Sequence, residues 1–126
     1  MGLLSGILGN AATLEVAELQ EKYGDMLTEN EEIELGFQLI RDTFIFTNFR
    51  LILVDVQGLT GKKTEYMSVL YGEISRFSIE TAGHLDLDAE LKIWLGSADL
   101  PAISKKFNKE VNIYDVQKVL ATHLIK

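Results

Sequence analysis

The chain has 126 residues, of which 47% are hydrophobic and 25% charged, a balance that is ordinary for a soluble globular protein. At this length it builds one domain with its own core, and because it holds no cysteine it has neither a disulfide framework nor a thiolate metal site. The net charge of −7 weighs against nonspecific binding to nucleic acid or to anionic membranes, which depends on basic patches.

The charge is distributed unevenly along the chain. Residues 1–34 carry eight acids against Lys22, which gives −7, whereas residues 101–126 carry five lysines against two acids, which gives +3. An acidic N-terminal segment and a basic C-terminal segment attract each other within a monomer or between neighbouring copies. Charges of this kind also occur on helix faces that are simply exposed to solvent. The first residues lack the basic region of a signal peptide, so we expect a cytoplasmic protein.

The first quarter of the chain is expected to be helical. Apolar residues recur at helical spacing over residues 13–27, with Thr13 as the N-cap. A small apolar face precedes this helix and consists of Leu3, Leu4, Ile7 and Leu8. We therefore treat residues 1–27 as an N-terminal helical extension and residues 28–126 as the main domain.

A run of strands is expected after this helix, beginning with strict alternation of apolar and polar residues from Glu32. The strands are expected at residues 33–39, 43–47, 49–56, 65–70, 74–81 and 85–95, with a hairpin loop over residues 58–63. The pattern is clearest in the last of these, where every odd position is apolar and the only tryptophan, Trp94, falls on the solvent-facing side. An edge strand is expected within residues 101–107, because its proline stands at the start.

A helix from about residue 113 to residue 125 closes the chain, with an apolar stripe that faces the core. The sequence thus predicts a mainly β fold with a helix at each end. Seven consecutive antiparallel strands tend to roll into a barrel, and a terminal helix can plug its open end.

Three blocks of sequence resemble the bacterial pleckstrin-homology (PH) domain family. They are FTNFRLILVD, QGLTGKKTEYMSVLYGEISRFSIETAGHLDLDAELKIW, and the closing pair PAISKKF and IYDVQKVLATHLI. The resemblance covers about residues 27–126. It implies two nearly orthogonal antiparallel sheets of seven strands capped by the C-terminal helix, with the N-terminal helix outside the shared core. It also implies a ring-like homo-oligomer without catalytic activity.

The residues that usually carry catalysis or metal binding are not arranged for it. Asp86, Asp88 and Glu90 share one strand face, but side chains two apart on a strand diverge into solvent, so a solvated face is expected rather than a Ca²⁺ site. His84 and His123 are far apart in sequence and have no cysteine to complete a metal site. We predict no catalytic residue, no metal and no cofactor, and hence a non-enzymatic protein.

Basic residues offer only a weak candidate anion site. Eukaryotic PH domains that bind phosphoinositides place several Lys and Arg in the first hairpin loop, whereas this loop offers Arg41 beside Asp42. We therefore do not expect phosphoinositide binding. Arg41, Lys62 and Lys63 remain weak candidates for contact with an anionic head group.

Exposed apolar residues are the stronger candidates for function. Large aromatic side chains on a surface are enriched at protein interfaces, which makes Trp94 an interface candidate. The other interface candidates are Leu4, Ile7 and Leu8 of the apolar N-terminal face. The leading hypothesis is a cytoplasmic assembly module that binds copies of itself and another protein, and no nucleic acid. The alternative is a membrane-surface adaptor that uses the N-terminal apolar segment and the Lys62–Lys63 hairpin.

Overall fold

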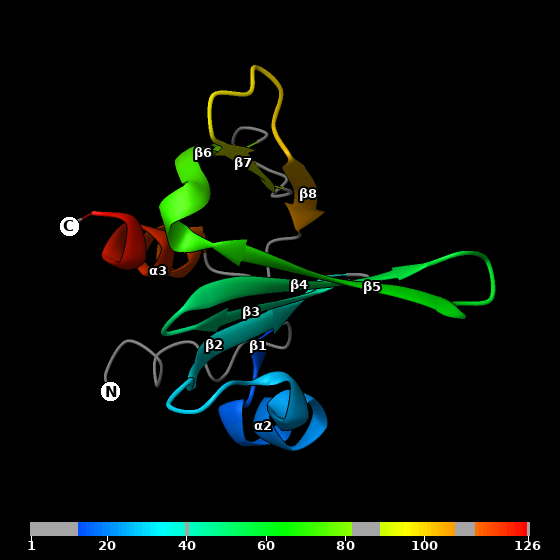
Figure 1. Ribbon diagram of the computed structural model, residues 1–126. Coiled ribbons are helices and arrows are strands. Elements are labelled where there is room, and N and C mark those ends of the chain that lie inside the picture. The colour runs from blue at the N-terminus through cyan, green and yellow to red at the C-terminus, as the bar shows by residue number, and fades with distance from the viewer. Residues whose placement is uncertain (1–12, 40, 82–88, 108–112, 126) are drawn as a thin grey trace.

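A computed structural model describes residues 13–39, 41–81, 89–107 and 113–125 of the chain (Figure 1). In chain order the described elements are β1 (Thr13–Leu14), α2 (Val16–Tyr23), the 3₁₀ turn η1 (Gly24–Met26), β2 (Ile33–Gln38), β3 (Thr43–Thr47), β4 (Arg50–Gln57), β5 (Lys63–Leu70), the 3₁₀ turn η2 (Tyr71–Glu73), β6 (Ile74–Thr81), β7 (Ala89–Leu95), β8 (Ile103–Phe107) and α3 (Ile113–Leu124).

The strands form two antiparallel sheets. Sheet A has the order β1-β2-β3-β4-β5 and sheet B the order β6-β7-β8. The prediction of seven antiparallel strands in two sheets with a helix at each end is confirmed, and β1 is an additional short strand. Over the residues that the structure describes, the two sheets do not join into the barrel that the sequence predicts, which is a minor difference. The chain leaves sheet A after β5 and enters sheet B only after η2, and within the described ranges no ladder joins the two sheets.

The N-terminal helix is shorter than the sequence predicts. Thr13 is not its N-cap, because Thr13 and Leu14 pair with Phe37 and Gly36 at the edge of sheet A. The N-cap is Glu15, which makes no side-chain capping bond, and α2 gives way to the 3₁₀ turn η1 at Gly24. Pairing with the sheet therefore overrides the local capping preference of threonine.

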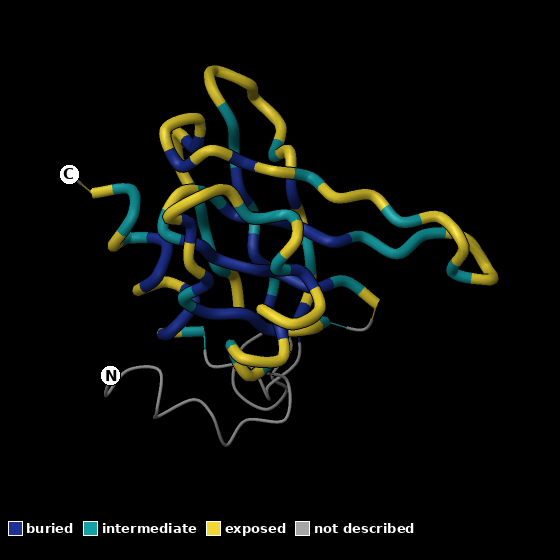
Figure 2. Tube along the Cα trace, turned by 60° about the horizontal axis from the view of Figure 1, so that its bottom comes forward, coloured by how far each residue is buried: buried dark blue, intermediate teal, exposed yellow. Residues whose placement is uncertain are grey.

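The main core lies between the two sheets and α3 (Figure 2). It joins Phe37, Phe44 and Phe46 of sheet A to Leu91 and Ile93 of β7, and all five side chains are almost fully buried. The stacked rings of Phe37 and Phe44 have centroids 5.2 Å apart. The helix α3 completes this core with Val116, Val119 and Leu120.

A second, smaller core lies on the opposite face of sheet A. Leu19 and Tyr23 of α2 pack there against Ile33, Ile45, Ile52 and Val54. Because α2 covers one face and sheet B the other, every residue of β3 is buried. These two elements do not cover β5 in the same way, and only Val69 of that strand is buried. The position of α2 therefore decides which strand of sheet A stays open to solvent.

The close approach of α2 to β2 depends on Gly36. A Cβ atom at this position would overlap the Leu19 side chain and would lie 3.3 Å from the carbonyl oxygen of Phe44. The Leu19 side chain thus occupies the volume that any larger residue at position 36 would need.

We expect Gly36→Ala to destabilise the protein by about 1–3 kcal/mol, because overpacking forces Leu19 and α2 away from the sheet. The measurement is urea unfolding followed by circular dichroism. Gly72→Ala is the matched control, since no atom lies within 4 Å of the added methyl group, and it should change stability by less than about 0.5 kcal/mol. Equal midpoints for the two variants would contradict the packing argument.

Candidate interaction surfaces

The outer face of sheet B carries the sequence-predicted interface residue Trp94. As the alternation predicts, Trp94 lies on the face opposite the buried Leu91 and Ile93. The guanidinium of Arg76 lies over its ring, 4.5 Å from the ring centroid, and its indole N–H donates to the Asp99 carbonyl at 3.1 Å. Trp94 is therefore partly buried, and its orientation is fixed by two contacts within the chain.

The rest of this face is polar and internally paired. Lys92 forms an ion pair with Glu80 at 3.0 Å, and the Ser104 hydroxyl donates to Glu90 at 2.7 Å. These neighbours satisfy one another across the three strands of the sheet. The face thus presents one aromatic side chain within a polar surround, which is the usual composition of a transient interface.

A second surface, which sequence reasoning missed, lies along β5. Tyr66 and Leu70 point away from the main core and are 53% and 58% exposed, and together they form the feature called here the β5 strip. Their cross-strand partners are Val54 and Arg50 of β4. Tyr66 thus stands beside Val54 on the outer face of sheet A, just past the edge of the area that α2 covers. The available signal was the alternation Thr64, Tyr66, Ser68, Leu70 opposite Met67 and Val69.

Phe49 adds to the exposed apolar surface at the Leu70 end of the strip, because it precedes Arg50, the register partner of Leu70. Phe49 is 49% exposed and sits in a rigid turn between β3 and β4. The Thr47 hydroxyl oxygen accepts hydrogen bonds from the backbone N–H groups of Phe49 and Arg50, each at 3.0 Å. The same hydroxyl donates to the carboxylate of Glu31 at 2.7 Å.

Glu31 is the buried anchor of this turn. The Arg50 guanidinium donates to both of its oxygens, at 2.8 and 3.0 Å, and also to the Met26 carbonyl. These bonds from Arg50 lower the pKa of Glu31 to about 2 against the opposing effect of burial, and bonds from Thr28 and Thr47 add to the lowering. The pair thus ties the end of η1 to β4, next to the exposed Phe49.

We expect stability to fall as the pH drops from about 4.5 to about 2, because the folded state holds the pKa of Glu31 below its unfolded value of 4.5. The contribution is fully present above that value, and protonation of Glu31 removes about 3 kcal/mol. The measurement is urea unfolding at several pH values. Glu31→Gln should be less stable at neutral pH and should lose this slope, whereas Glu32→Gln, with an exposed side chain, should keep it.

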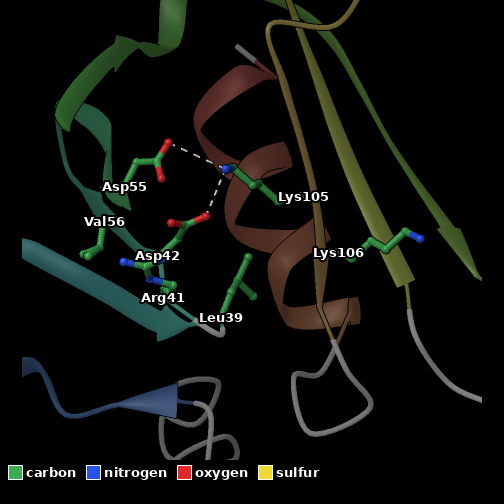
Figure 3. A pocket seen from close by; sticks show the side chains of 7 residues that line it. All are labelled: Leu39, Arg41, Asp42, Asp55, Val56, Lys105 and Lys106. Atoms are coloured by element: carbon green, nitrogen blue, oxygen red, sulfur yellow. Dashed lines mark ion pairs between the residues drawn. The ribbon is translucent and has the colours of Figure 1, made fainter. Parts of the chain in front are cut away.

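A polar pocket lies between sheet A and β8 (Figure 3). Its volume is about 320 Å³, and its lining residues are Leu39, Arg41, Asp42, Asp55, Val56, Lys105 and Lys106. Lys105 points inward between Asp42, at 2.9 Å, and Asp55, at 3.7 Å. Lys106 points away from this group (Figure 3).

The charges in the pocket neutralise one another. Burial alone would lower the pKa of Lys105, but Asp42 and Asp55 outweigh it and raise that pKa. Burial would likewise raise the pKa of Asp55, and the bonds from Gln57 and Lys105 outweigh it and lower that pKa. Since the ammonium is already paired with two carboxylates, the pocket does not favour an additional anion.

The three weak anion-site candidates come from one region of the fold. Arg41 donates to the Gly58 carbonyl at 2.7 Å, at the start of the hairpin turn whose far side carries Lys62 and Lys63. This β4–β5 hairpin projects from the body of the protein in Figure 1. The fully exposed Leu59 lies in the turn. The other predicted interface residues, Leu4, Ile7 and Leu8, lie outside the described residues.

His123 has a specific partner that the sequence did not reveal. Its Nε2 lies 2.7 Å from Glu34 of β2, and its ring stacks on Tyr71 at 4.2 Å. The Tyr71 hydroxyl in turn donates to the Thr47 carbonyl at 2.7 Å. These contacts hold the last turn of α3 against sheet A, which is a structural role.

Within the described part of the chain, no three His, Asp or Glu side chains gather closely enough to hold a metal ion. Asp86 and Asp88 lie outside that part. None of the helices in the described ranges is long and apolar enough to cross a membrane.

Two antiparallel sheets packed on a shared core, with a C-terminal helix completing it, define a PH-like domain. The profile of the bacterial PH domain family matches residues 2–124, so the chain belongs to that family. The chain is 59% identical over 121 residues to the uncharacterized protein YjqA of Bacillus subtilis. This match covers 96% of this chain and 97% of YjqA.

Solved structures agree with this assignment. A PH domain from Shewanella amazonensis superposes with a TM-score of 0.82 at 38% identity and covers 99% of this chain and all of its own. A DUF1696-family protein with a PH domain from Shewanella loihica gives a TM-score of 0.81 at 43% identity, over 92% of this chain and 98% of its own.

Proposed function

We propose that this protein is a non-enzymatic assembly module of the cytoplasm that forms a ring-like homo-oligomer and presents a surface to another protein. The observation that supports this most is the β5 strip. It places two large apolar side chains, each more than half exposed, at the open edge of a sheet whose central strand β3 is buried at every position. Exposed apolar side chains on an unpaired sheet edge favour association.

The shape and charge of the molecule support a ring rather than a two-fold dimer. The candidate surfaces differ: one is the β5 strip on sheet A, and another is the polar face around Trp94 on sheet B. The acidic residues 1–34 and the basic residues 101–126 are also unlike. Contacts between unlike surfaces are head-to-tail, and they close into rings when the rotation between copies permits.

The polar groups of the interior support a structural rather than catalytic role. Glu31 is held by Arg50, and Lys105 is held by Asp42 and Asp55. A catalytic acid, base or nucleophile needs access to substrate and a protonation state that can change during the reaction. These groups are instead fixed as ion pairs.

We expect light scattering at micromolar protein and moderate salt to give a mass several times that of the 14.1 kDa chain. Trp94→Ala should lower that mass, because it removes the aromatic contact from the face of sheet B. Leu59→Ala is the control, since Leu59 lies in the hairpin turn away from that face. A monomeric wild-type protein would overturn the proposal, and an unchanged assembly in Trp94→Ala would remove Trp94 from the interface.

One observation favours a membrane-surface adaptor as the second candidate. The hairpin turn combines the fully exposed Leu59 with the exposed Lys62 and Lys63, and Arg41 is bonded to the same turn. Burial of one leucine contributes about 1.5–3 kcal/mol, and each lysine near an anionic surface adds about 1 kcal/mol. A single turn would thus bind in the millimolar to high micromolar range, and stable attachment would need several copies.

For this second candidate we expect the protein to co-sediment with vesicles that contain anionic lipid. Lys62→Glu with Lys63→Glu should abolish the binding, and removal of residues 1–12 should weaken it. Neutral vesicles serve as the control. Protein that stays in the supernatant with both kinds of vesicle excludes this candidate and leaves the assembly proposal in place.

A further inference from the structure

The described chain begins on the opposite side of sheet A from the β5 strip. β1 and β5 are the two outermost strands of this sheet (Figure 1). With neighbouring strands about 4.8 Å apart, four intervals separate them by about 19 Å. Residues 1–12 therefore join the fold at one edge of the sheet, and the exposed apolar strip lies at the other.

The path between these two edges within one copy is obstructed on both faces. On the outer face, Leu19 and Tyr23 of α2 pack on Ile45 and Ile52 of the central strands. On the inner face, the core between the sheets is filled by side chains such as Phe44 and Leu91. A segment that starts at β1 would have to pass over α2 to reach the β5 strip of its own copy.

The chemistry of the N-terminal segment matches that of the strip. Residues 1–12 contain no charged side chain, and their large apolar residues are Met1, Leu3, Leu4, Ile7 and Leu8. The outer positions of β5 are likewise uncharged and consist of Thr64, Tyr66, Ser68 and Leu70. The charged side chain beside the strip is Arg50, which donates to Ser68 and is already paired with Glu31, so burial of these surfaces leaves no charge unpaired.

β5 also lacks the usual devices that protect an edge strand. It contains no proline, and its eight-residue ladder with β4 runs without a register shift. Its charged residues, Lys63 and Glu65, lie toward the hairpin end and not beside Leu70. An edge of this length without proline, bulge or central charge is suited to contact another chain.

We propose that the apolar residues Leu3, Leu4, Ile7 and Leu8 of one copy cover Tyr66 and Leu70 of the next copy. The inference rests on the homo-oligomer proposed above and names the contact that builds it. Twelve residues span at most about 40 Å when extended, which is enough to reach a neighbour. Because the donor and the acceptor lie at opposite edges of one sheet, each copy gives the segment to one neighbour and receives it from the other.

Two variants of the whole chain test the two sides of this contact separately: the donor is the N-terminal segment that one copy gives, and the acceptor is the β5 strip that receives it. The donor variant carries Leu4→Glu and Ile7→Glu, and the acceptor variant carries Tyr66→Glu and Leu70→Glu. All four changes place charge in the proposed contact, and loss of such a contact weakens association about thirtyfold or more. Sedimentation velocity should show each variant as a monomer. Leu59→Glu, with its side chain fully exposed in the same hairpin, is the matched control and should assemble like the wild type.

The decisive sample is an equimolar mixture of the two variants. The donor variant keeps an intact strip and the acceptor variant keeps an intact segment, so the mixture should form a dimer with one copy of each and nothing larger. A mixture that stays monomeric would overturn the exchange between copies. Variants that still form the wild-type assembly would overturn this contact while the homo-oligomer stands. A monomeric wild-type protein would instead overturn the homo-oligomer and this inference with it.

Cross-linking provides a readout that does not depend on weakened association. Since the chain has no cysteine, Leu4→Cys with Leu70→Cys introduces the only two thiols. Mild oxidation should give a ladder of disulfide-linked multimers on a denaturing gel. Leu4→Cys with Leu59→Cys should give no ladder. Absence of the ladder in the first variant, or its presence in the second, contradicts the proposed contact.

Discussion

The structure depends on one constraint, which is that the central strands of sheet A must be covered on both faces. β3 is buried at every position, and β4 is buried from Leu51 to Val54. Sheet B covers one face and α2 covers the other. The helix can approach because Gly36 leaves room for Leu19. The eight-residue helix α2 is too short to cover all five strands, so the outer face of β5 remains exposed to solvent.

Two ion-pair groups hold the parts that the apolar cores do not reach. Glu31, Arg50 and Thr47 fix the turn that carries Phe49. Lys105 bridges sheet B to Asp42 and Asp55 at the end of sheet A. In each group the buried charges are matched by opposite charges and hydrogen bonds, which offsets the cost of desolvation. The exposed candidate residues, Tyr66, Leu70 and Phe49, lie on the surface outside these groups.

The sequence was informative wherever a local repeat reflects burial. Period-two alternation located β2 and β7, because each of these strands shows one face to the core, and turn residues marked the ends of the strands between them. The same alternation put Trp94 on the outer face of sheet B. The helix-capping preference was misleading at Thr13, which pairs with Phe37 of β2 and is not the N-cap. Alternation also could not distinguish a closed barrel from two separate sheets, because closure depends on which edges meet.

The candidate surfaces show the same limit. Trp94 stood out by its type, whereas Tyr66 and Leu70 looked like ordinary strand residues. Their exposure is decided by where α2 ends on the sheet, a contact between residues far apart in the chain. The sequence by itself determined the strands, the terminal helices and the uneven charge, because each follows from composition or from spacing between near neighbours. Only the tertiary structure decided which edge of sheet A stays uncovered, because burial at one residue depends on segments that are distant in sequence.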